Sequence, residues 1–181
     1  MTYIQVFVTL KVPDNIALTA GHTLQNRMGY RALSSIRRSD FWQLHFPDAS
    51  AEQARQRCQW LVTRTAFFMN PNKHRWELVV SDRPIEEQQT VESLFQADAS
   101  VLVQDREDGL AETVSQALPR FFSQEERPQS LQRGVWWDLR FDPRPQENFE
   151  ALIREIALTT ERHKGLLANP HYQTYRSFIR E

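Results

Sequence analysis

Two arginines stand at matching places in the sequence and are the first candidates for chemistry. Arg38 precedes a run of alternating apolar residues, and Arg133 precedes a similar run 95 positions further along the chain. An arginine held between two strands can bind a phosphate or the carboxylate of a partner, because its guanidinium presents a planar fork of donors. The alternative is a turn arginine that pairs with a local acid, and both interpretations stay open at this point.

Trp136 is a third candidate for a partner contact. Trp137 follows it directly, and successive side chains of a strand point to opposite faces, so the two rings cannot both enter one core. We expect Trp137 to face the core, together with most of the remaining tryptophans, Trp42, Trp60 and Trp76. Trp136 then lies either between two copies of a repeat or on a partner surface, because aromatic side chains dominate protein interfaces.

The sequence contains no motif for catalysis, cofactor binding or metal binding. The closest of its five glycines, Gly21 and Gly29, lie eight positions apart, whereas a phosphate-binding loop needs several glycines within about six residues. The five histidines form no helical pair and no cluster with acids, so no metal site is expected. Cys58 lies on an apolar helical stripe and is expected to be a buried, unreactive thiol. A catalytic triad assembled from distant residues stays open.

Composition places the chain among water-soluble globular proteins. Its 181 residues are 40% hydrophobic and 25% charged, which allows one domain or two small ones. A formal net charge of −1 gives no reason to expect nucleic acid or an anionic membrane as a partner. Apolar runs such as 66–69 are far shorter than the roughly 20 residues of a membrane helix. With one cysteine and no signal peptide, the expected location is the cytoplasm.

The two halves of the chain resemble each other. Four residues recur 95 positions apart in the same order, namely Arg38, Trp42, Leu44 and Phe46 as Arg133, Trp137, Leu139 and Phe141. Val6 and Val8 recur as Val101 and Val103 with the same spacing. Asn70-Pro71 recurs as Asn169-Pro170, and Trp76 as Tyr175, 99 positions apart. This order predicts a tandem duplication with one repeat over 1–82, a linker over 83–97 and a second repeat over 98–181.

Each repeat is predicted to fold as strand–helix–strand–strand–helix–strand. The periodicities in the first repeat predict a strand over Ile4–Leu10, a helix over Ala17–Met28, strands over Leu33–Ile36 and Phe41–Phe46, a helix over Ala51–Phe68 and a strand over Trp76–Val80. In the second repeat, the helical stripes are Leu110, Val114, Ala117 and Phe121, then Phe149, Leu152, Ile153 and Ile156.

Capping residues locate the ends of these helices. Asp14 or Asn15 is expected to cap the first helix, and Asp48 or Ser50 the second. Gly29 suits the left-handed position after a helix, and Asn70-Pro71 is expected to end the second helix. In the linker, Pro84 and the apolar residues Val91, Leu94 and Phe95 predict a short helix.

This order of elements predicts an α+β protein with a ferredoxin-like arrangement. Each repeat would form a four-stranded antiparallel sheet covered on one face by two helices. A unit of about 80 residues is marginal alone, so two copies are expected to complete each other as a covalent pseudo-dimer. Whether their sheets pack face to face or join edge to edge stays open.

Several of these segments resemble PurS, the small subunit of phosphoribosylformylglycinamidine synthase. The resemblance rests on the segments 6–11, 28–30 and 36–38, on the helix before Asn70-Pro71, and on the segment 165–170 followed by Tyr175. It implies a non-catalytic subunit without cofactor that docks the PurQ glutaminase on the PurL synthetase and supports ammonia transfer in purine biosynthesis. PurS proteins are usually single-copy dimers that read Arg-x-Gly-Lys where this chain reads Arg37-Arg38-Ser39-Asp40, so the chain resembles a fused, diverged dimer.

Two other interpretations remain. The first is a tandem ferredoxin-like protein of the dimeric α/β-barrel type that binds or transforms a small molecule. It predicts a closed polar cavity of several hundred Å3 around His45 or Arg38, whereas a filled core would exclude it. The second is a diverged PurS paralogue that serves as an adaptor in another complex.

Overall fold

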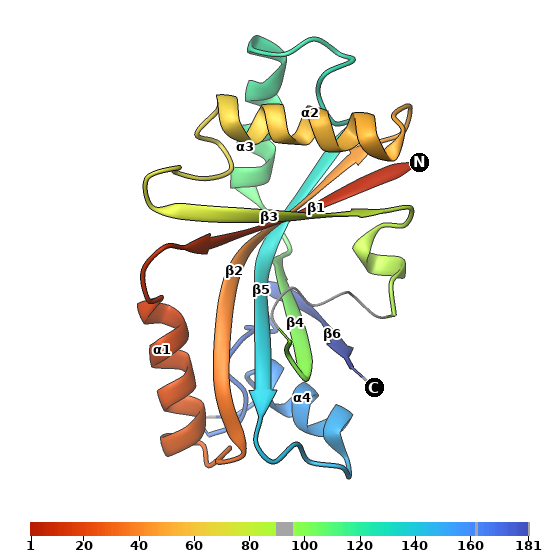
Figure 1. The fold of residues 1–181 in the computed structure, drawn as a ribbon. Coiled ribbons are helices and arrows are strands. Elements are labelled where there is room, and N and C mark those ends of the chain that lie inside the picture. Colours follow the sequence, from red (N-terminus) through yellow and green to blue (C-terminus); the bar gives the residue numbers. More distant parts are fainter. Residues whose placement is uncertain (90–95, 162, 181) are drawn as a thin grey trace. The chain divides into compact units, whose positions relative to one another are not determined.

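The computed structural model describes residues 1–89, 96–161 and 163–180 (Figure 1). Its strands are β1 (Thr2–Leu10), β2 (Leu33–Phe46), β3 (His74–Ser81), β4 (Ala99–Asp105), β5 (Ser130–Phe141) and β6 (Gln173–Ile179). Its α-helices are α1 (Asn15–His22), α2 (Ala51–Arg64), α3 (Gly109–Ala117) and α4 (Phe149–Ala157). Short π or 3-10 turns occupy Thr23–Arg27, Ile85–Glu87 and Leu118–Arg120. The linker helix expected around Val91, Leu94 and Phe95 falls outside the described residues.

The strands form a six-stranded antiparallel sheet in the order β3-β1-β2-β5-β4-β6. The expected α+β class is therefore confirmed. Strand pairing repeats with the spacings found in the sequence. Val6 pairs with Trp42 and Val101 with Trp137, 95 positions on, whereas Val8 pairs with Trp76 and Val103 with Tyr175, where the spacing of the partners becomes 99. Residues matched by sequence thus occupy equivalent positions in two sets of strands.

The prediction of two strands between the helices of each repeat is wrong. β2 runs without interruption from Leu33 to Phe46, and β5 likewise from Ser130 to Phe141 (Figure 1). A tight hairpin needs residues that adopt positive φ, typically Asn-Gly or Asp-Gly. The segment between the expected strands reads Arg37-Arg38-Ser39-Asp40 and offers no such pair. A run of charged residues is typical of a loop, but here Ser39 within the run is buried and the segment forms part of one continuous strand.

The chain forms two compact units that do not follow the two halves of the sequence. Unit 1 comprises Met1–Val12, Asp40–Gln88 and Asp108–Gly134. Unit 2 comprises the described residues of Pro13–Ser39, Gln89–Glu107 and Val135–Glu181. Each unit therefore combines segments from before and after the linker, and β2 and β5 each contribute one end to each unit. The sequence boundaries at 82 and 98 stay a prediction about the repeat.

The core of unit 1 lies between two helices and one face of its strands. Ile4, Val6 and Val8 of β1 alternate toward this face with Trp42 and Leu44 of β2, as their period of two predicts. Cys58 and Leu61 of α2 pack against them, and so do Ala111 and Val114 of α3. The second helix of this core thus comes from the later half of the chain. The periodicity of apolar residues did not predict this exchange.

Unit 2 repeats this layering with the other pair of helices. Its strand side chains come from β4 and β5, including Val101, Val103, Trp137 and Leu139. Ala17, Ala20 and Leu24 reach it from α1 and the π turn that follows, whereas Phe149, Ile153 and Ile156 reach it from α4. The predicted stripe of α4 is confirmed. That of α3 is partly wrong, since Ala111 and Val114 are buried but Leu110 and Phe121 are exposed.

The cap predicted for α2 is confirmed, but the predicted end of this helix is not. Ser50 caps α2 in a reciprocal capping box with Gln53, and Gly29 adopts the expected positive φ of 84°. The expected end of α2 at Asn70-Pro71 is wrong, because the helix ends at Arg64. Asn70 instead shapes the turn into β3. Its carbonyl accepts from the backbone N–H groups of residues 73 and 74, and Asn169 does the same before β6 with residues 172 and 173.

Gly165 is a backbone position that only glycine fits. Its φ is +73°, and a Cβ there would overlap the carbonyl group of Leu158. We expect Gly165→Ala to lower the free energy of unfolding by roughly 2 kcal/mol or more, through strain and displacement of the loop. Gly109→Ala is the matched control, because a Cβ at Gly109 meets nothing within 4 Å. Urea denaturation measures both, and an equal effect of the two variants would contradict the argument.

Candidate functional site

The recurring arginines each pair with the residue that caps a helix. Asp14 caps α1, since its Oδ1 accepts from the backbone N–H groups of Ile16 and Ala17 at 2.8 and 3.3 Å. Arg38 of β2 lies with its Nη1 3.4 Å from Asp14 Oδ2. The first of the two expected caps, Asp14 rather than Asn15, is thus confirmed.

The same arrangement recurs 94 to 95 positions later, in unit 1. Asp108 caps α3 by accepting from the N–H groups of Leu110 and Ala111 at 3.1 and 3.0 Å. Arg133 Nη1 lies 3.7 Å from Asp108 Oδ1, and its guanidinium lies 5.9 Å from the ring centre of Trp42. The structure thus shows the pairing with a local acid at both arginines. Anion or partner binding by Arg38 or Arg133 stays a prediction.

Of the two positions expected for Trp136, the one on a partner surface is wrong, because the side chain is buried within this chain. Its side chain is only 2% exposed, and its ring stacks on Phe178 of β6 with ring centres 5.2 Å apart. The indole Nε1–H donates to Asp138 Oδ1 at 3.0 Å. Leu102 of β4 and Phe178 of β6, which lie on the same face as Trp136, are buried as well.

Asp138 is a buried carboxyl group that sequence reasoning missed. Its residue is 3% exposed, and its Oδ1 also accepts from Ser100 Oγ at 2.6 Å. Among the described residues, Oδ2 has no hydrogen-bond partner. Burial raises the pKa of Asp138 above its usual range, and the hydrogen bonds from Ser100 and Trp136 and the charges of Arg180 and Arg37 oppose that rise.

A cavity of about 180 Å3 adjoins this carboxyl group. It is lined by Ser35, Arg37, Ala97, Asp138 and Arg140, all of which belong to unit 2. Comparison of the two halves of the sequence could have pointed to Asp138. Asp138 corresponds to Gln43 and Ser100 to Gln5 at the spacing of 95, so a neutral pair in one repeat is matched by a pair with a carboxylate in the other.

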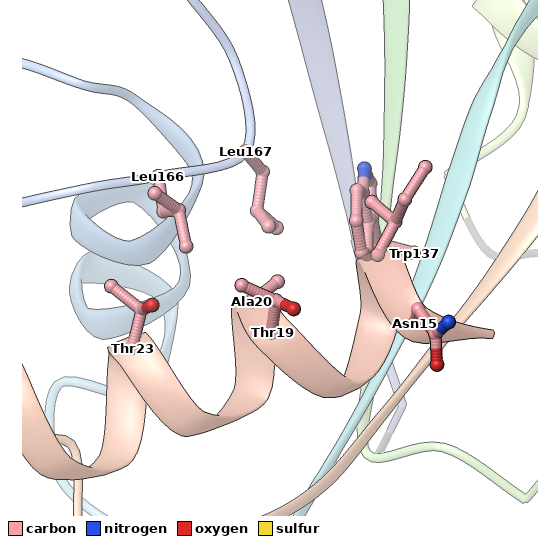
Figure 2. Close-up of a pocket in the computed structure, with 8 residues that line it drawn as sticks. Asn15, Thr19, Ala20, Thr23, Trp137, Leu166 and Leu167 are labelled. Carbon is pink, nitrogen blue, oxygen red and sulfur yellow. The ribbon is translucent and has the colours of Figure 1, made fainter. Parts of the chain in front are cut away.

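A larger apolar cavity of about 480 Å3 lies between α1 and the loop before β6 (Figure 2). Thr19 and Ala20 of α1 and Thr23 of the π turn that follows face Leu166 and Leu167 across it, and Trp137 stands at one end. Trp137 is 6% exposed, and its indole N–H has no partner among the described residues. This volume falls within the range of small-molecule sites. Neither His45 nor Arg38 lines it, and its lining is apolar rather than polar.

Unit 1 carries an aromatic surface and a polar cavity. Trp60 is 38% exposed and Phe121 63%, so Trp60 is an exception to the expectation that most tryptophans lie in the core. Trp60 meets Phe122 edge-on at 4.8 Å, and Phe121 meets Phe67 in the same way at 5.8 Å. The cavity, of about 840 Å3, has a mixed lining that includes Asp48, Arg57, Ser115, Glu125 and Arg127.

Other titratable residues take structural positions. Cys58 is fully buried, so its expected buried position is confirmed, and burial raises the pKa of its thiol to about 12. His45 stacks on Tyr3 with ring centres 4.4 Å apart, and burial lowers the pKa of its imidazole. In the described ranges, no three residues of the types that bind metals cluster together. No helix within them is long and apolar enough to cross a membrane.

Comparisons with models of protein families, with curated proteins and with solved structures found no match to this chain. The resemblance to PurS therefore rests on the residues and their order given above.

The pairing of Arg38 with Asp14 is expected to stabilise unit 2 beyond the cap itself. Asp14→Ala removes both the cap and the ion pair, so we expect it to lower the free energy of unfolding by about 1–2 kcal/mol. Asp14→Asn keeps a good capping residue and loses only the charge, so its loss should be about half a kcal/mol. Urea denaturation measures both variants, and an Asp14→Asn chain as stable as the wild type would contradict a stabilising role of the ion pair.

Proposed function

We propose that this chain is a non-catalytic assembly subunit of the PurS type. In this role it docks a glutaminase subunit on an ATP-dependent synthetase subunit, so that ammonia released from glutamine reaches the synthetase. Its two repeats serve as the two protomers of a dimer fused into one polypeptide. The resemblance of segments to PurS supports this proposal, and so does the repeated architecture.

The repeated strand register is the observation on which the proposal rests. Val6 with Trp42 and Val101 with Trp137 are equivalent pairs, and the ion pairs Arg38–Asp14 and Arg133–Asp108 fix the helix after the first strand in each repeat. The Asn-Pro turns add a third repeated feature. Lys11 Nζ donates to the carbonyl of Pro71, and Arg106 Nη2 donates to that of Pro170. Two copies of one module in a chain supply two related docking surfaces.

The apolar cavity of unit 2 favours a second candidate function, the binding of a small molecule. Its wall combines the alkyl groups of Ala20, Leu166 and Leu167 with the ring of Trp137. The hydroxyls of Thr19 and Thr23 and the indole N–H supply a few polar groups, which is the usual composition of a ligand site. The ligand class that fits is a mainly apolar molecule with one hydrogen-bond acceptor.

Reconstitution with the purified glutaminase and synthetase subunits of the same organism tests the assembly role. We expect the chain to raise glutamine-dependent amidine formation by roughly a hundredfold, the lower end of what a high effective concentration supplies. With ammonium chloride in place of glutamine, the synthetase should be equally active without the chain, and this assay is the internal control. Full glutamine-dependent activity without the chain would refute the proposal.

Substitutions on two faces of α1 test the second candidate. Thr19 lines the apolar cavity, whereas Leu18 is exposed and does not line it. The fluorescent apolar dye anilinonaphthalene sulfonate should bind the wild-type chain, and Thr19→Trp should weaken its binding about tenfold by filling the space. Leu18→Trp is the matched control and should leave the dissociation constant unchanged. Dye binding that is absent, or that Thr19→Trp does not alter, would count against this candidate.

A further inference from the structure

The small polar cavity of unit 2 has the form of a pit with a buried acid in its wall. Ser35, Arg37 and Arg140 line it and are exposed, so they form the rim. Asp138 lines the same cavity but is 3% exposed, so it lies at the base. A molecule entering from solvent therefore meets two guanidinium groups first and a carboxylate last.

The base of the pit holds an acceptor without a donor. Asp138 Oδ1 is satisfied by Ser100 Oγ at 2.6 Å and by Trp136 Nε1 at 3.0 Å. Oδ2 has no partner in the part of the chain that the structure describes. A buried carboxylate oxygen without a donor is costly, so a donor placed in the neighbouring space would stabilise it.

At the equivalent position in unit 1, Gln43 has partners for both of its polar atoms, whereas its strand neighbour Gln5 has none among the described residues. Gln43 stands where Asp138 stands in the repeat, and its Oε1 accepts from the backbone N–H of Ile85 at 2.6 Å. Its Nε2 donates to Gln132 Oε1 at 2.9 Å and to Glu86 Oε2 at 3.3 Å. Protein groups thus occupy the space beside Gln43. At Asp138, a cavity takes their place and the side chain ends in a carboxyl group.

The charges around the pit select a ligand that carries both signs. A simple anion would suit Arg37 and Arg140 but would leave Asp138 Oδ2 facing negative charge, and a simple cation would meet the two guanidinium groups at the rim. A volume of about 180 Å3 equals roughly six water molecules at ~30 Å3 each. This is the size of a molecule with roughly five to seven heavy atoms.

We propose that this pit binds a free small α-amino acid, whose ammonium group donates to Asp138 Oδ2 while its carboxylate accepts from Arg37 and Arg140. A guanidinium carries five N–H donors, so Arg37, which already makes a contact, can also bind a ligand carboxylate together with Arg140. The proposal concerns unit 2 alone and does not depend on the assembly function.

Calorimetric titration of the full chain with glycine, L-alanine and L-serine tests the proposal. At least one of these amino acids should bind, and acetate and methylamine, which each carry one of its two charges, should bind at least about tenfold more weakly. The indole N–H resonance of Trp136 should shift on binding, because this group donates to the same carboxylate. That shift locates the ligand at the pit and not elsewhere on the chain.

Substitutions of Asp138 and Arg140 test whether their charges bind the amino acid. Asp138→Asn keeps an oxygen for Ser100 and Trp136 but replaces the free acceptor with a donor, so affinity should fall about tenfold or more. Arg140→Gln at the exposed rim should weaken binding similarly without affecting folding, and so provides a test if the buried variant does not fold. Arg75→Gln removes an exposed arginine of β3 in unit 1 and is the matched control.

Three results would overturn the proposal. These are the absence of binding by all three amino acids, phosphate or acetate binding as tightly as they do, and equal losses from Arg140→Gln and Arg75→Gln. Because reconstitution with the glutaminase and synthetase measures a different property, a failure here leaves the assembly role untouched, and the reverse also holds.

Discussion

The uninterrupted length of β2 and β5 is the constraint on which the rest of this architecture depends. At about 3.3 Å per residue, the 14 residues of β2 span roughly 46 Å. The 14 residues of α2, the longest of the four α-helices in the described residues, span only about 21 Å at 1.5 Å per residue. One layer of helices therefore cannot cover such a strand. Its two ends must enter two cores, which is how the chain divides into unit 1 and unit 2.

This constraint explains why the units do not follow the order of the sequence. α1 follows β1 in the chain but packs with β4 and β5, and α3 follows β4 but packs with β1 and β2. Each exchanged helix needs something to fix its first turn to the strand it crosses. The ion pairs Arg38–Asp14 and Arg133–Asp108 contribute to this, because each joins an arginine of a shared strand to the charged cap of the helix in its own unit.

Sequence reasoning succeeded where one residue and its near neighbours decide the structure. The period of two in β1, the cap at Ser50 and the left-handed Gly29 are local, and the repeat spacings of 95 and 99 reappear as strand register. It failed where a distant segment decides. Nothing local tells a helix such as α3 which strands it will cover, and its exposed Leu110 and Phe121 look the same in the sequence as buried residues.

The buried site at Asp138 was missed for a related reason, since an acid within a strand usually indicates a solvent-facing position. Its difference from Gln43 in the other repeat is informative because stability alone does not favour it. An asparagine at position 138 would keep an oxygen for the hydrogen bonds from Ser100 and Trp136 and would avoid burying a charge, which costs several kcal/mol when it is incompletely paired. A carboxylate that raises the free energy of the folded chain, beside a cavity lined by arginines, is better explained by what it binds than by what it stabilises.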